Sequence, residues 1–168
     1  MPALHPTTTY NVEATLNQWI ITKFATITMP AGVTLNYTFE MIQTDASMTT
    51  PSFSIVHRPA TRDMAYQGHM AVDARNIMQI SGWVSRNNNP AWLPQQKAMT
   101  AMIEALFASP AVIQIQDYLS APASPTPVTY VVRTFACDFL SLPHDPNPNI
   151  ERVSANIVYE WQLRTNVT

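Results

Sequence analysis

The sequence predicts an α+β fold, in which a mostly antiparallel β-sheet packs against two or so α-helices. Two segments carry apolar residues at three- and four-residue spacing, which is typical of one helical face. Several other segments alternate apolar and polar residues, which is typical of half-buried strands. The 168 residues can bury a core. We therefore expect a single domain over 1–168, with an extended N-terminal arm at about 1–10.

The segment from Asn76 to Phe107 combines a strand and a helix. Residues 77–84 are rich in β-branched and aromatic types, which favours a strand. Asn89 is a candidate helix cap and Pro90 suits a first turn, so we expect a helix over 92–108. A strand that feeds an amphipathic helix needs a sheet on which the helix can lie.

The other elements follow from the same two periodicities. Asn11 is a candidate cap for a helix over 12–24. His57 to Asp63 is the densest charge in the chain, and we interpret it as a loop. Further strands are expected at 33–41, 52–56, 112–118, 128–138 and 152–163. The residues expected to point inward include Leu16, Ile20, Phe39, Ile80, Met102, Leu106, Phe107, Ile157 and Tyr159.

The composition favours a subunit of an assembly. Only 12% of residues are charged and the net charge is −2, against roughly 25% charged residues in a typical soluble domain. The surface therefore consists largely of small polar and apolar side chains, which is poor for a freely diffusing monomer. No basic stripe is present to grip nucleic acid, and no apolar run is long enough for a membrane span.

The titratable residues show no recognised catalytic or metal-binding spacing. A Cys137 nucleophile with His144 as its base would need both in one cleft, and a buried, inert thiol is the commoner use of such a cysteine. His57, Arg58, Arg62 and Asp63 could bind an anion, although a solvated loop or an intersubunit ion-pair patch explains them better. We therefore expect no enzyme activity, no metal and no cofactor.

The segment from Thr61 to Arg75 is a candidate subunit interface. A strand that starts at Tyr66 and runs unbroken into 77–84 would exceed about 45 Å, so we expect either a bulge or a hairpin arm. It mixes apolar and charged residues as interface rims do. The alternative is an ordinary surface loop. The candidate interface residues are Arg62, Asp63, Tyr66, Met70, Asp73 and Arg75.

Several features follow one another along the chain: an N-terminal helix, the turn at 29–32, an alternating strand after it, Gln67-Gly68, the segment 75–84, an Ala-rich helix closing at 105–107 and a final strand at 156–161. Their order resembles that of the tail terminator (tail-completion) proteins of long-tailed bacteriophages. The resemblance covers most of the chain. The chain departs from the family in its proline-rich loops at 122–127 and 143–148 and in its long N-terminal arm.

This resemblance implies a structural role in the virion neck. Such proteins form a six-fold ring that caps the tail tube, ends tube polymerisation and meets the head-side connector, while DNA passes through the lumen without sequence-specific binding. The expected location is the virion, after assembly in the host cytoplasm. The alternatives are another neck or minor tail protein of the head-closure type, a small cysteine hydrolase, or a binding module that adds to another protein's sheet.

Overall fold

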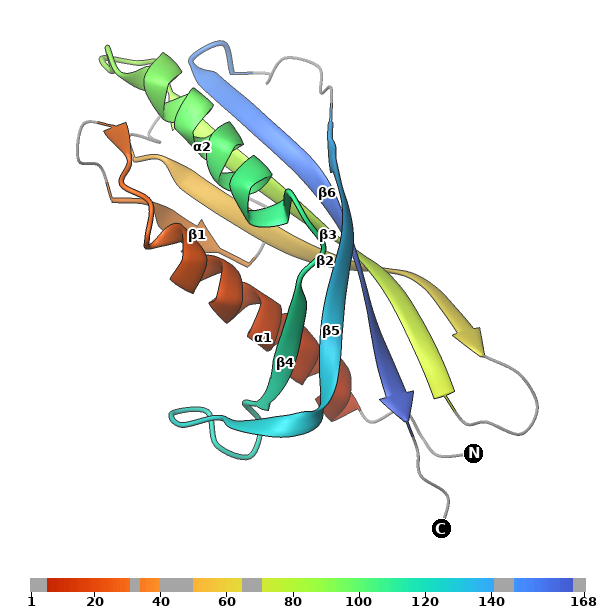
Figure 1. Ribbon diagram of the computed structural model, residues 1–168. Helices are drawn as coiled ribbons and strands as arrows, with labels where there is room; N and C mark the ends of the chain where they lie inside the picture. Colours follow the sequence, from red (N-terminus) through yellow and green to blue (C-terminus); the bar gives the residue numbers. More distant parts are fainter. Residues whose placement is uncertain (1–5, 31–33, 40–49, 65–70, 141–146, 165–168) are drawn as a thin grey trace.

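The computed structural model describes residues 6–30, 34–39, 50–64, 71–140 and 147–164. These form two helices and six strands, which confirms the α+β class (Figure 1). In chain order the elements are α1 (Pro6–Phe24), β1 (Asn36–Thr38), β2 (Ser52–Met64), β3 (Ala71–Ser85), α2 (Trp92–Phe107), β4 (Val112–Asp117), β5 (Thr126–Phe139) and β6 (Ile150–Arg164).

The strands form one sheet in the order β1-β2-β3-β6-β5-β4. The pairs β2–β3, β3–β6, β6–β5 and β5–β4 are antiparallel, whereas β1 runs parallel to β2. The sheet is therefore mixed. A parallel neighbour needs a longer connection than a hairpin does, and the chain between Thr38 and Ser52 provides one.

The two helices cover the apolar face of the sheet. Helix α2 lies across β3, β6 and β5, and α1 runs beside β4 (Figure 1). Phe24 of α1 packs on Phe53 of β2 with ring centroids 4.9 Å apart, and Trp19 meets Phe107 of α2 at 6.0 Å. The two helices thus share one core with the sheet, in which Leu16, Ile20, Ile80, Met102 and Ile157 are buried as expected.

The sequence prediction was wrong about where α1 begins. The helix starts at Pro6, so residues 6–10 are helical and do not form an extended arm, and Asn11 lies within the helix. The Asn11 side chain bonds to Asp117 and to the backbone that follows β4. A residue suited to capping a helix is used here to cap the end of a strand.

The cap of α2 also differs from the prediction. The N-cap is Ala91 and has no side-chain cap bond. The Asn89 Oδ1 atom accepts from the Ala91 N–H at 3.1 Å, and its Nδ2 atom donates to Gln95 Oε1 at 2.8 Å. Asn89 therefore shapes the turn before the helix, while the predicted helix itself is confirmed within one residue of its end.

Two strand predictions need correction. The strand expected at 33–41 is only Asn36–Thr38 among the described residues, and Phe39 is 48% exposed. The charged segment 57–63 is not a loop but part of β2, because pairing with β3 extends through it. A register shift between Pro59 and Thr61 places a bulge in β2, whereas the described part of the long strand expected from Tyr66 to Val84 pairs with β6 without one. Leu106 is only partly buried against the core.

Gly82 of β3 sits where the sheet and α2 come closest. A Cβ atom there would lie 2.8 Å from Met99 Cε, 3.0 Å from Val153 Cγ1 and 3.1 Å from Phe53 Cε1. These distances are shorter than ordinary van der Waals contact, so α2 can approach β3 this closely only because residue 82 has no side chain.

Gly82→Ala is therefore expected to lower the free energy of unfolding by about 1–3 kcal/mol through overpacking. The measurement is denaturant unfolding of both proteins. Met99→Ala in the same chain removes the closest contact, so the alanine at 82 should cost less in that background than in the wild type. An equal cost in both backgrounds would contradict the packing explanation.

Candidate interaction surface

The backbone brings four of the six predicted interface residues together at the far end of the β2–β3 hairpin. Asp63 pairs with Asp73, Arg62 with Ala74, and Arg75 with Thr61. Tyr66 and Met70 lie outside the described residues. The hairpin prediction is thus confirmed for the backbone, and the role of this end as an interface stays a prediction.

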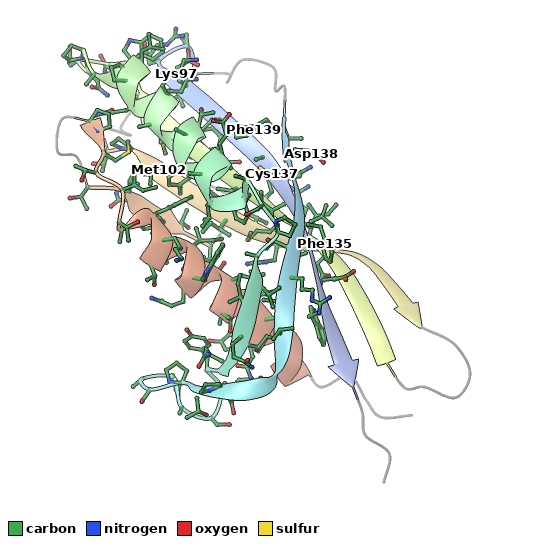
Figure 2. The ribbon with its side chains drawn as sticks, in the orientation of Figure 1. Lys97, Met102, Phe135, Cys137, Asp138 and Phe139 are labelled. Carbon is green, nitrogen blue, oxygen red and sulfur yellow. The ribbon has the colours of Figure 1, made fainter. Side chains whose placement is uncertain are left out.

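A second surface was missed in the sequence, namely the outer edge of β5 beyond Thr134. Strand β4 pairs with β5 only through Thr126–Arg133. From Ala136 to Phe139, β5 pairs with β6 on one side and with no described strand on the other, and Phe135 lies in the bulge just before this stretch. Phe135 and Phe139 are 43% and 40% exposed (Figure 2). We call the stretch Phe135–Phe139 the β5 edge.

Two hydrogen bonds between Ala111 and Thr134 explain why β4 does not cover the β5 edge. The Ala111 N–H donates to Thr134 Oγ1, and the Thr134 N–H donates to the Ala111 carbonyl, both at 2.9 Å. Ala111 lies between α2 and β4, so these reciprocal bonds fix the point where the chain turns away from β5. A bulge between Thr134 and Ala136 follows on the same strand.

The β5 edge is acidic as well as apolar. Asp138 is exposed on the strand, and Glu104 is exposed on α2. Both carboxylates act on Cys137: burial chiefly raises the pKa of its thiol, and the charges of Asp138 and Glu104 raise it further. The edge thus combines two exposed phenylalanines with the negative charge of Asp138, while Glu104 of α2 is a second carboxylate whose charge acts on Cys137.

The opposite margin of the sheet has a similar unpaired stretch. Strand β1 covers only Ser52–Ser54 of β2. Beyond that point β2 pairs with β3 alone, as far as the described chain goes. We call residues Ile55–Arg58 the β2 edge. Its exposed charged side chain is Arg58.

The edge of β4, in contrast, is occupied by α1. The Gln116 N–H donates to Thr15 Oγ1 and the Tyr118 N–H donates to Asn11 Oδ1, both at 2.9 Å. The two side chains stand four residues apart, on one face of the helix. They satisfy backbone donors that would otherwise offer a pairing site to another strand.

The residues with nucleophilic or basic chemistry are not brought together. Cys137 and His57 stand in the same cross-strand row, but β6 and β3 lie between them. Three strand spacings amount to about 14 Å. His144 lies outside the described residues. The described chain also contains no cluster of three or more His, Cys, Asp or Glu side chains that could hold a metal ion.

His57 instead joins β2 to α1 and β6. Its Nε2 atom is 2.8 Å from Asn17 Oδ1, and its Nδ1 atom is 3.1 Å from the Tyr159 hydroxyl. With Asn17 Oδ1 as acceptor, the ring carries its proton on Nε2, and Nδ1 accepts from Tyr159. Burial lowers the pKa of His57 to about 4 and raises that of Tyr159, so both side chains are neutral near pH 7.

No helix in the described part of the chain has the length and apolar character of a membrane span. Comparison with models of known protein families and with curated protein sequences found no match to this chain.

The neutral His57 predicts a pH dependence of stability. Its pKa is about 4 in the folded chain and about 6.5 in the unfolded one, so the unfolded chain binds the extra proton first. The free energy of unfolding should therefore be highest above pH 6.5 and fall as the pH drops towards 4, by up to about 3 kcal/mol from this group. His57→Gln should remove this part of the slope in denaturant unfolding at several pH values, and identical slopes would count against it.

The raised pKa of Cys137 predicts that its thiol reacts slowly with alkylating reagents. At pH 7 iodoacetamide should alkylate the native protein more slowly than the same protein unfolded in denaturant, because the thiolate is the reactive form. Mass spectrometry of the modified fraction over time measures this. Faster alkylation of the native protein would indicate an activated thiol and favour the hydrolase alternative.

Proposed function

We propose that this chain is a structural subunit of a phage neck, of the tail terminator type, that assembles as a homomeric ring on the end of the tail tube. In this role it stops tube polymerisation and offers its other face to the head-side connector. Six copies form the ring, and DNA passes through its lumen. The order of sequence segments set out above is the observation that carries the proposal.

Features of the fold support an assembling subunit. Beyond the bulge in β2, the ends of β2, β3 and β6 continue together and splay away from both helices (Figure 1). An extension of paired strands of this kind can reach a neighbour in a head-to-tail ring. The low content of charged residues is also suited to a chain that hides much of its surface.

The proposal includes the absence of catalysis. Cys137 and His57 are separated by two strands, whereas a nucleophile and its base need hydrogen-bond contact. The His57 ring already bonds to Asn17 and Tyr159. These contacts give His57 a structural role, in which it connects α1 to the sheet.

The proposal predicts that the genome encoding this chain also encodes a tail-tube protein, and the test uses that tube protein. Tube protein polymerises alone and in the presence of the full chain, and electron microscopy records the tube lengths and tube ends. A terminator should shorten the tubes and add a ring of density at one end only. Unchanged tube lengths, with no density at either end, would overturn the proposal.

The hairpin end provides a variant for the same assay. Arg62→Glu with Arg75→Glu should reduce the fraction of tube ends that carry a ring, and the reduction should shrink as salt is added, because rim charges are screened. Lys23→Glu with Lys97→Glu makes the same change of charge on the two helices and should leave occupancy unchanged. Equal occupancy for both variants at every salt concentration would contradict the role of the hairpin end as a subunit interface.

A further inference from the structure

We propose that the β5 edge of one copy pairs in antiparallel fashion with the β2 edge of the next copy, so that one continuous sheet runs through neighbouring subunits. The partner is a second copy of this chain. The inference rests on the proposed homomeric ring and specifies how its subunits join.

The two edges lie level with each other across the sheet. Phe139 pairs with Ala155, which pairs with Ile80, which pairs with Ile55. In the same way the row of Cys137 leads through β6 and β3 to His57. The unpaired stretch of β5 and the unpaired stretch of β2 therefore occupy the same cross-strand rows, and neighbours can join without a large shift along the strands.

The strand directions also match. Successive strands β2, β3, β6 and β5 are antiparallel, so β2 and β5 run in opposite directions. A rotation about an axis along the strands keeps each direction, so β5 meets the neighbour's β2 antiparallel. The Leu140 N–H donates to Ser154 of β6 at 2.8 Å. By alternation, the backbone groups of Cys137 and Phe139 point away from β6, towards the incoming strand.

The side-chain faces agree as well. The Cys137 and Phe139 rows run through the buried Met78, Ile157, Ile80 and Ala155, and so belong to the core face. Asp138 and Arg58 stand in the alternate rows and lie on the opposite, outer face. A rotation that keeps this outer face on the same side of the sheet in every copy places Asp138 of one copy diagonally opposite Arg58 of the next. Residues in diagonal positions are within reach of a long side chain.

The charges disfavour the two symmetric contacts, in which two β5 edges or two β2 edges would pair with each other. Pairing two β5 edges would set Asp138 near the Asp138 of the other copy. Pairing two β2 edges would set Arg58 near another Arg58. Like charges across a strand pair are destabilising. The favoured contact therefore joins unlike edges, and such contacts generate rings or filaments rather than closed pairs.

Charge reversal tests the pairing through ring occupancy on tubes. Asp138→Arg alone and Arg58→Asp alone should each reduce subunit association about ten-fold, because each places like charges across the contact. The double variant should recover association, because it restores an opposite pair. Within one copy the two positions are about three strand spacings apart, or roughly 14 Å, so the recovery cannot arise inside a subunit.

Mixing the two single variants sharpens the test. An equimolar mixture of Asp138→Arg and Arg58→Asp chains matches opposite charges at every contact when the copies alternate, so the mixture should form rings that neither variant forms alone. Thermal melting of each variant checks that the exposed substitutions leave the fold intact.

The outcomes separate this inference from the proposed function. Rings that form equally well from wild type, both single variants and their mixture would overturn the edge pairing while leaving the terminator role in place. A wild-type chain that neither self-associates nor caps tubes would overturn both.

Discussion

The pairing of β3 with β6 is the interaction on which the other parts of the structure depend. The two strands pair over the full 15 residues of β3. β2 lies against the free side of β3 and β5 against the free side of β6, and α2 crosses the ladder where Gly82 lets it approach. Because both outer strands are held in register by the same ladder, their exposed edges end at matching levels on opposite margins of the sheet.

The edges of this sheet differ in whether another part of the chain covers them. Helix α1 closes the edge of β4 with Asn11 and Thr15, whose oxygens accept from backbone N–H groups of 116 and 118. The β5 edge carries two exposed aromatic rings and Asp138, and the β2 edge carries Arg58. A soluble chain normally protects bare strand edges because they promote association. Protection of one edge and exposure of two others is consistent with association that is specific in place and partner.

Much of the fold could be predicted from periodicity, because α2, β3 and β6 carry regular apolar patterns that burial enforces. The capping predictions failed at Asn11 and Asn89, since an Asn side chain can satisfy any nearby backbone group and its partner is set by the tertiary fold. The charge of the segment 57–63 favours a loop, yet pairing with β3 overrides that local preference. The β5 edge could not be predicted, because whether a strand has an outer neighbour depends on topology.

The strand order has a consequence for how the chain acquires its structure. β6 is last in sequence among the six strands but lies in the middle of the sheet, between β3 and β5. Until β6 leaves the ribosome, the hairpin β2–β3 and the hairpin β4–β5 have no strand to join them. Helix α1 also depends on a distant segment, because its bond from Asn11 to Asp117 of β4 spans 106 residues. Two-stranded hairpins are marginally stable on their own, so completion of the sheet by the final strand is a late, long-range step.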